Sequence, residues 1–314
     1  MSRGGSETTG DPLVSVIIPT FNRRNLVLRA IESALAQSYR PFEVLVQDDG
    51  STDGTGEAIA ALTAPVDYVW QANRGLAAAR NVAIRRSRGE LIALLDSDDA
   101  WTADKLERCV RYLQQHPDVD VVYTPMATVD AAGRVMAGHD KPCKAGWLLD
   151  DLFESICIHD PAAVFHRRVW ERVGGFDESL PVCVGHNFWL RVAVAHKFGV
   201  IDEPLAVRTW LKDSLTRAKK ARVFRIKAEM LHRFYSEQGG EERLDQPRAR
   251  RALAKACFTA GRLAARDGDW AYASRLFFGA VYYRPTLRSR ILYWIADWQR
   301  RRRGLAKIES RPAA

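Results

Sequence analysis

Five consecutive aliphatic residues that run straight into a group of carboxylates constrain this chain more than any other feature. The run occupies residues 91–95, and Asp96, Asp98 and Asp99 follow it directly. An apolar run without alternation is typical of a strand covered on both faces, as in a parallel sheet. In open sheets of that kind, ligands bind beyond the carboxyl ends of the strands. The sequence therefore predicts a buried strand that carries its acids to a binding edge.

Three carboxylates so close together repel one another unless a positive group lies among them. A hard divalent cation that also binds phosphate oxygens is the usual partner of such a group. The alternative is an acidic cap for the helix that follows Trp101, and Asp99 by itself could fill that role. The acids alone leave both interpretations open.

The segments around this strand alternate between strand-like and helix-like spacing. Short aliphatic runs predict strands, and apolar positions three to four residues apart predict helices. We expect strands at 14–18, which Pro19 ends, at 42–46 and at 68–70, and helices at 26–35, 53–62, 75–86 and 105–114. Strands that alternate with helices indicate an α/β fold with a doubly wound, mostly parallel, Rossmann-like sheet.

Polar residues follow each predicted strand at the point where it ends. They occupy residues 19–22, 48–51, 73–75 and 96–99. Because the carboxyl ends of parallel strands meet at one edge of a sheet, we expect these four segments to lie together. For Asp48 we favour a structural role in a turn or helix cap. The edge is the candidate active site.

Four ordered segments resemble family 2 glycosyltransferases of the GT-A fold. They read VSVIIPTFNR at 14–23, DDGSTDGT at 48–55, NRGLAAARN at 73–81 and LDSDD at 95–99, and the resemblance extends over residues 13–215. It implies an inverting enzyme that moves a sugar from a nucleotide-sugar donor to a carbohydrate or lipid-linked acceptor. Such an enzyme would take part in polysaccharide or glycoconjugate synthesis.

The same resemblance assigns roles to individual residues. Those implicated in donor binding are Pro19, Thr20 and Phe21 beside the base, Asp49 at the uracil or ribose edge, Asn73 and Arg80 on the bordering helix, and Asp96 and Ser97 near the diphosphate. Asp96 and Asp98 would bind Mn²⁺ or Mg²⁺, a Lewis acid that stabilises the leaving diphosphate. For Arg80, a solvated helix face is the alternative.

The chain departs from the family where the catalytic base is expected. Residues 168–178 match a second family hallmark, and 188–191 begin the helix that carries the base. Val184 and Gly185 stand where the resemblance implies Glu-Asp. His186 is the nearest titratable side chain, and histidine can act as a base near neutral pH. The alternatives are a helix-start histidine bound to a carbonyl, or an altered residue at this position.

Other assignments and functions compete with these. His159 and Asp160 fall where family members often have acceptor-side residues, and an ordinary turn is the alternative. A donor-binding scaffold that has lost its base is a rival function. A nucleotidyltransferase is a second rival, but no Gly-rich phosphate loop with a lysine follows the first strand.

Residues 215–314 differ from the rest in charge and pattern. They carry 24 basic and 9 acidic residues, whereas residues 1–214 carry 23 and 29. Their pattern is helical, with helices expected at 223–235, 248–266 and 270–283, the last two forming one tetratricopeptide-like hairpin. We therefore expect a disordered tail at 1–12, a catalytic domain at 13–215 and a helical region at 216–314.

The last helix, expected at 287–303, combines an apolar face with flanking arginines. The apolar face consists of Leu287, Ile291, Trp294, Ile295 and Trp298. A basic amphipathic helix with tryptophans suits an anionic membrane surface, and a packing helix with a solvated basic end is the alternative. No nucleic-acid recognition motif accompanies the charge, so we expect no nucleic-acid partner.

Cysteine usage and hydropathy indicate the compartment. The five cysteines lack paired or zinc-like spacing, which is typical of reduced structural thiols. No run of about 18 apolar residues predicts a membrane span, and the polar N-terminus does not resemble a signal peptide. We expect a cytoplasmic protein that can bind peripherally to the cytoplasmic membrane face.

Overall fold

The computed structural model describes residues 10–130, 133–136, 142–210 and 220–305. It forms two compact units, the first of Met1–Leu148 and Cys157–Trp210 and the second of Leu149–Ile156 and Leu211–Ala314. Most of the tail expected at 1–12 lies outside the described residues. Residues 149–156, which the sequence assigns to the catalytic domain, group instead with the helical unit.

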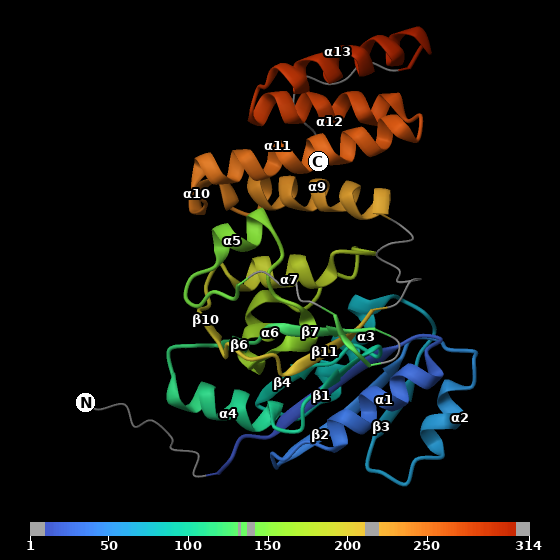
Figure 1. Cartoon of the computed structure of the whole chain (residues 1–314), viewed down its shortest axis with the longest axis vertical. Coiled ribbons are helices and arrows are strands. Elements are labelled where there is room, and N and C mark those ends of the chain that lie inside the picture. Colours follow the sequence, from blue (N-terminus) through green and yellow to red (C-terminus); the bar gives the residue numbers. More distant parts are fainter. Residues whose placement is uncertain (1–9, 131–132, 137–141, 211–219, 306–314) are drawn as a thin grey trace. The chain divides into compact units, whose positions relative to one another are not determined.

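The first unit is built on a seven-stranded, mostly parallel sheet (Figure 1). Its strands, in spatial order, are β10 (Phe198–Val200), β6 (Val121–Tyr123), β9 (Ala163–His166), β4 (Leu91–Leu94), β1 (Val14–Thr20), β2 (Phe42–Asp48) and β3 (Asp67–Trp70). Only β9 runs antiparallel to its neighbours β4 and β6. The prediction of a doubly wound α/β sheet is therefore confirmed.

The central strands β1 and β4 are buried along their whole length, as the unbroken apolar run predicts. The prediction that Pro19 ends the first strand is wrong, because β1 continues to Thr20. The backbone nitrogen of Pro19 faces β4, and pairing between β1 and β4 has already ended at Ile17. The proline therefore removes no hydrogen bond from the ladder.

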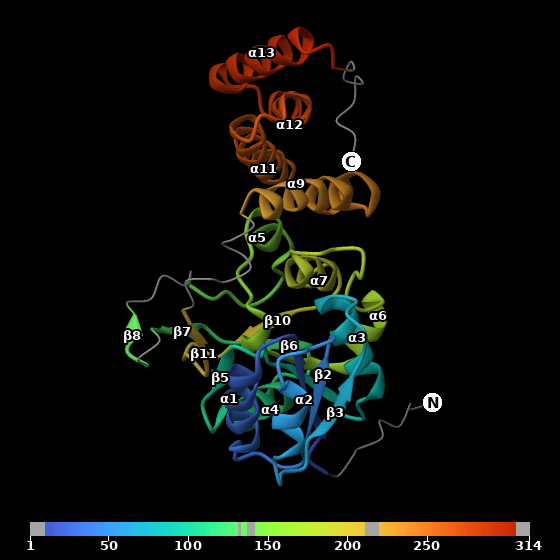
Figure 2. The same cartoon turned by 90° about the vertical axis from the view of Figure 1, so that its right-hand side faces the viewer.

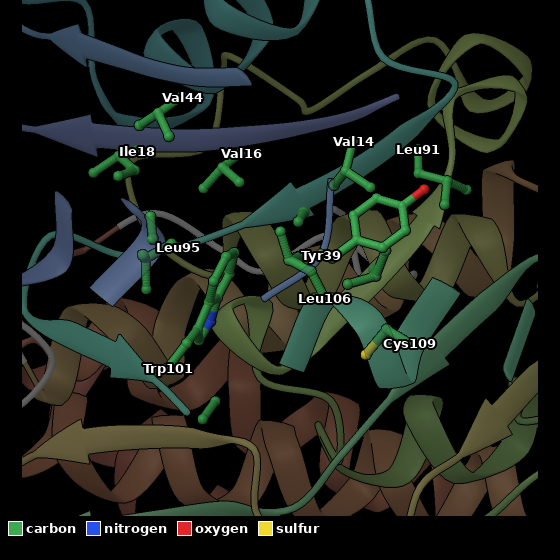
Figure 3. Close-up of a cluster of buried hydrophobic side chains, with 14 of the residues drawn as sticks. Val14, Val16, Ile18, Tyr39, Val44, Leu91, Leu95, Trp101, Leu106 and Cys109 are labelled. Carbon is green, nitrogen blue, oxygen red and sulfur yellow. The ribbon is translucent and has the colours of Figure 1, made fainter. Parts of the chain in front are cut away.

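Helices cover both faces of this sheet (Figure 2). On one face, α1 (Arg24–Leu35) and α4 (Lys105–Gln115) pack against alternate residues of β1, β2 and β4. Figure 3 shows this core, in which Val14, Val16 and Ile18 lie above Trp101 and Leu106. On the other face, α3 (Leu76–Arg86) packs against β1 and β2.

The remaining elements of the first unit flank the sheet. The helices are α2 (Thr55–Ala60), α6 (Arg167–Val173), α7 (Val184–Val192) and the short 3-10 helix η1 (Asp160–Ala162). A second sheet contains β5 (Asp99–Trp101), β11 (Ala206–Thr209), β7 (Met126–Val129) and β8 (Val135–Met136). Residues 96–99, the acidic segment, follow the end of β4 and enter β5, which begins at Asp99, so this segment connects the two sheets.

The second unit is entirely helical in its described part (Figure 1). Its helices are α5 (Leu149–Glu154), α9 (Lys220–Glu237), α10 (Gly240–Arg243), α11 (Gln246–Arg266), α12 (Trp270–Tyr283) and α13 (Leu287–Arg302). Helix α5 is attached to α11 by Arg248, which bonds Asp151 at 3.1 Å and Glu154 at 2.9 Å. Phe153 of α5 also packs against Phe234 of α9. These long-range contacts explain why α5 joins this unit.

Candidate active site

The loops that follow β1, β2 and β3 contact one another at the carboxyl edge of the large sheet. The Asn22 N–H donates to Ser51 Oγ at 2.8 Å, and the Thr52 N–H donates to Asn22 Oδ1 at 2.8 Å. Gly50 has a φ of 94°, and a Cβ there would lie 3.0 Å from the Asn73 nitrogen. Glycine at position 50 thus allows the third loop to approach. These contacts join three of the four segments that were expected to converge, 19–22, 48–51 and 73–75.

Asp49 holds the loop that leads into α3. It is buried, and its Oδ1 accepts hydrogen bonds from Gln71 Nε2 at 2.7 Å and from the Arg74 N–H at 2.9 Å. Its Oδ2 accepts from the Gly75 N–H at 2.7 Å. Asp48 has a structural role, since it accepts from the Ser51 N–H and the Tyr68 hydroxyl. Asp49 is thus a fixed acceptor at the sheet edge.

The other residues expected near the donor base differ in exposure. Pro19 and Thr20 are buried at the end of β1, whereas the Phe21 side chain is 45% exposed. Among the residues the structure describes, the buried Thr20 hydroxyl has no hydrogen-bond partner. Asn73 is exposed in the loop before α3, so the expectation that it lies on the helix is wrong.

Arg80 is fully buried, so the alternative of a solvated helix face is wrong. Its guanidinium donates to Asp160 Oδ2 and to Asp96 Oδ1, each at 2.6 Å, and lies 5.2 Å from the centre of the Phe176 ring. Burial opposes the charge, but the two carboxylates outweigh it and raise the pKa of Arg80. A permanent cation therefore joins the acidic segment to η1.

Asp98 also has an arginine partner, Arg23, at 2.6 Å. Asp99 lies in β5, and the N-cap of α4 is Asp104, so Asp99 does not cap that helix. Burial raises the pKa of Asp99 well above its usual range, and the carboxylates of Asp96 and Asp98 raise it further. A raised pKa favours the neutral form of Asp99, so Asp96 and Asp98 are the acids of this segment that can face a cation.

The acidic segment has the donor set that a phosphate-bound cation needs. The side chains of Asp96 and Asp98 are 32% and 28% exposed, and Ser97 between them is buried. Over the described ranges, no three His, Cys, Asp or Glu residues form a group suited to a metal. Mg²⁺ commonly uses one or two carboxylates and completes its shell with phosphates and water. Asp96 and Asp98 fit that kind of site.

The start of α7 lies against Asp160. A Cβ on Gly185 would fall 2.7 Å from the Asp160 Cγ and even closer to both carboxylate oxygens. Trp189, one helical turn further along, donates from Nε1 to Asp160 Oδ1 at 2.7 Å. His186 is buried on the same helix, and His159 is half-buried before η1. A carboxylate from another segment thus occupies the space in front of residue 185.

The second hallmark, at 168–178, attaches to α3. Asn81 Nδ2 donates to the Phe176 carbonyl at 2.9 Å, and Asn81 Oδ1 accepts from the Phe176 N–H at 2.9 Å. Gly175, with a φ of 79°, lies so close to Asn81 that a Cβ would fall 2.8 Å from Oδ1. These bonds place the Phe176 ring beside Arg80.

Sequence reasoning did not identify Arg23, Trp189 or Lys105 as site residues. Arg23 is the last residue of the family-like segment at 14–23, and this position could have marked it as a site residue. Lys105 is fully buried and donates to the Ala162 carbonyl at 3.0 Å. An isolated lysine or tryptophan in a helix gives no such signal, because its partner is distant in the chain.

The chain matches known proteins over this same region. A family model described as glycosyl transferase family 2 matches residues 15–199. Chondroitin synthase of Escherichia coli is 33% identical over 61% of this chain and 28% of its own length. Hyaluronan synthase of Pasteurella multocida is 32% identical over 60% of this chain and 19% of its own. The chain thus spans less than a third of these two relatives.

Solved structures with the same fold cover nearly the whole chain. TarS residues 1–349 from S. aureus, in complex with UDP-GlcNAc, has a TM-score of 0.60 at 19% identity, over 94% of this chain and 93% of that one. The mannosyltransferase PcManGT from Pyrobaculum calidifontis, in complex with GDP-Man and Mn²⁺, has a TM-score of 0.55 at 21% identity, over 93% and 86%. With its sheet-edge site and a match over more than half of its length, the chain belongs to glycosyl transferase family 2.

Proposed function

We propose that this chain transfers a sugar from a nucleotide-sugar donor to a carbohydrate or lipid-linked acceptor, with inversion at the anomeric carbon. One observation carries the proposal: Asp96 and Asp98, each partly exposed and bonded to an arginine, lie at the carboxyl edge of the sheet. Such an edge can hold a nucleoside diphosphate through a cation on its acids and through arginines. Membership of a glycosyl transferase family favours this over a nucleotidyltransferase.

The nucleoside would bind over the loops after β1 and β2. The exposed Phe21 ring offers a face for the base, and the buried Thr20 hydroxyl offers an unused donor. Asp49 would accept from the base or ribose, since Oδ2 receives only one hydrogen bond from the described residues. Asn73 and Pro19 would border this site. UDP-GlcNAc in TarS and GDP-Man in PcManGT make both nucleotides reasonable donors to test.

The diphosphate would lie beside the acidic segment. Asp96 and Asp98 would hold Mn²⁺ or Mg²⁺, with Ser97 next to the phosphates. Such a cation, when bound, acts as a Lewis acid on the departing phosphate. Arg80 fixes Asp96 in orientation and keeps its own charge close to the developing negative charge. Fixed charges of this kind stabilise a transition state without reorganising.

Inversion at the anomeric carbon corresponds to a single displacement. The acceptor oxygen attacks the anomeric carbon from the face opposite the leaving diphosphate, and a base removes its proton. On sequence grounds His186 is one candidate for that base. His186 is buried on α7.

We further propose that α13 docks on an anionic membrane and brings the enzyme to a lipid-linked acceptor. Leu287, Ile291, Trp294 and Trp298 are 77%, 49%, 70% and 45% exposed, whereas Leu292, Tyr293 and Ala296 pack against α11 and α12. The helix therefore packs with one face and leaves the tryptophan face exposed. Apolar and aromatic side chains next to arginines suit a membrane interface.

Fewer arginines of α13 are free to attract an anionic surface than its sequence suggests, because two of them share a carboxylate. Arg300 is buried and bonded to Asp297 at 2.6 Å, and Arg301 bonds the same carboxylate. The exposed Arg288, Arg290 and Arg302 supply the remaining attraction. No helix in the described part of the chain is both long and apolar enough to cross a membrane.

Donor turnover tests the function directly. The full chain is incubated with UDP-GlcNAc, GDP-Man and other nucleotide-sugars, with Mn²⁺ and with or without oligosaccharide acceptors. Release of nucleoside diphosphate and the anomeric configuration of the product are measured. We expect metal-dependent release and an inverted product. Binding of nucleoside diphosphates without any turnover would instead support the donor-binding scaffold.

A further inference from the structure

The proton that leaves the acceptor hydroxyl needs an acceptor, and Asp160 is a carboxylate of the candidate site to which the donor contacts proposed above assign no role. We propose that Asp160 is the general base, in place of a carboxylate on the side chain of residue 185. The inference rests on the proposed function and adds a residue and a step to it.

Asp160 is joined to the diphosphate side of the site by a single guanidinium. Arg80 bonds Asp160 Oδ2 with one terminal nitrogen and Asp96 Oδ1 with the other, each at 2.6 Å. The two carboxylates therefore lie on either side of one planar group. A sugar whose diphosphate binds near Asp96 would have its anomeric carbon on the same side of the sheet edge as Asp160.

Asp49, Asp96, Asp98 and Asp99 at this edge are buried, hold a loop or are assigned to the cation. Asp49 accepts three hydrogen bonds that hold a loop, and Asp99 is buried in β5. Asp96 and Asp98 are the acids that would hold the cation. Asp160 accepts one hydrogen bond on each oxygen, and its side chain is 13% exposed. A carboxylate has about four acceptor positions, so Asp160 retains acceptor capacity.

Asp160 is also held rigidly, as a catalytic group should be. Trp101 Nε1 donates to the Pro161 carbonyl at 2.8 Å, and Lys105 Nζ donates to the Ala162 carbonyl at 3.0 Å. Both donors are buried side chains. Together with the indole of Trp189 on the carboxylate itself, they fix the turn and the side chain. Preorganisation of this kind is what a proton acceptor needs.

Gly185 and Asp160 share a single space. Because a Cβ on residue 185 would lie 2.7 Å from the Asp160 Cγ, any side chain there would displace the carboxylate. The Asp160 carboxylate can therefore lie against the first turn of α7 only because residue 185 is glycine. A carboxylate can reach this space from the helix or from η1, but not from both.

The proposed step balances as a single displacement. The acceptor oxygen forms the new bond to the anomeric carbon as the bond to the diphosphate oxygen breaks. The electron pair of the broken bond stays with the diphosphate. The acceptor proton passes to an oxygen of Asp160 and is later lost to solvent. General-base catalysis of this type typically contributes about 10²–10⁴-fold.

The test exchanges the carboxylate between the two positions. Release of UDP from UDP-GlcNAc and of GDP from GDP-Man, with Mn²⁺ and with water as acceptor, is measured for wild type and four variants. These are Asp160→Asn, Asp160→Ala, Gly185→Asp and the double variant Asp160→Ala/Gly185→Asp. Calorimetric binding of UDP and GDP reports folding and the donor site. Asp118→Asn, at an exposed aspartate paired with Lys197, is the matched control.

We expect Asp160→Asn and Asp160→Ala to lose about 10²–10⁴-fold in turnover while nucleotide binding stays within about twofold. Gly185→Asp alone should also lose turnover, because its side chain collides with Asp160. The double variant should recover at least tenfold over Asp160→Ala, and Asp118→Asn should match wild type.

Several results would overturn the inference. Wild-type turnover in Asp160→Asn would do so, as would a double variant no better than Asp160→Ala. Loss of nucleotide binding in Asp160→Asn would make Asp160 a positioning residue for Arg80. A large loss in His186→Ala beside a fully active Asp160→Asn would assign the base to His186. A wild-type chain that releases no nucleotide from any donor contradicts the proposed function, and with it this inference.

Discussion

Arg80→Met is the substitution that most directly tests the electrostatics of the site. It removes a cation that is fully buried and bonded to two carboxylates at 2.6 Å. Methionine keeps an unbranched apolar stem of related shape but leaves both acids without their partner. We expect the first unit to lose stability because a desolvated carboxylate without a partner is costly.

The exposed fractions of Asp160 and Asp96 determine how much the free energy of unfolding falls. The Asp160 side chain is 13% exposed, so breaking its ion pair resembles breaking a buried pair, which costs about 3–5 kcal/mol. Asp96 is 32% exposed and can recover water, so its pair adds about 1 kcal/mol or less. The free energy of unfolding should therefore fall by about 3–6 kcal/mol in total.

The assay is urea unfolding of the full chain, followed by fluorescence and circular dichroism. Arg23→Met is the control, since Arg23 and Asp98 are 22% and 28% exposed and their pair should contribute about 1 kcal/mol or less. Asp160→Asn completes a double-mutant cycle. In the Arg80→Met background it removes an uncompensated charge, so it should cost about 1–3 kcal/mol less there than in wild type.

Two outcomes would refute this reasoning. Equal losses of about 1 kcal/mol in Arg80→Met and Arg23→Met would mean that burial does not desolvate the Asp160 carboxylate. Additive effects of Arg80→Met and Asp160→Asn would mean that the two side chains do not interact.

Three further predictions address the donor, the membrane and pH. Asp98→Ala should weaken Mn²⁺-dependent binding of UDP or GDP more than tenfold in calorimetry, and equal affinity with a chelator present would remove the cation role. Truncation after Pro285 should abolish low-salt co-sedimentation with anionic vesicles but not nucleotide binding, and unchanged sedimentation would refute the α13 anchor. Burial, with help from Arg168, lowers the pKa of His166 to about 4, so the unfolded chain takes up this proton first and stability falls as pH drops from about 6.5 to 4. Urea unfolding should show that His166→Gln loses about 1–2 kcal/mol less over that range, after discounting for partial exposure, and an identical loss would contradict the shift.

The sheet and its binding edge could be predicted from the sequence because their signals are local. The apolar run at 91–95 and the polar residues after each strand are short-range patterns that tertiary contacts did not override. The end of β1 was predicted wrongly for a reason that is not local. Whether Pro19 breaks a strand depends on whether the neighbouring strand still pairs there, and β4 does not.

The contacts that decide the site could not be predicted in the same way. Arg80 read alone fits a solvated helix face, and its burial follows from Asp96 and Asp160, which lie 16 and 80 residues away in the chain. The assignment of α5 to the helical unit depends likewise on Arg248, 97 residues after Asp151. Propensity and periodicity carry no information about pairs at such separations.

The apparent loss of the base illustrates the difference most clearly. In the sequence, Gly185 lacks the carboxylate expected at this position, and the nearest titratable side chain, His186, is the natural substitute. In the structure, the space that a side chain of residue 185 would occupy is filled by the Asp160 carboxylate. Because a catalytic group is defined by where its atoms lie, a residue 25 positions earlier can supply the function that the aligned position lacks. An inactive enzyme should therefore be inferred from a missing side chain only after the space that it would occupy has been examined.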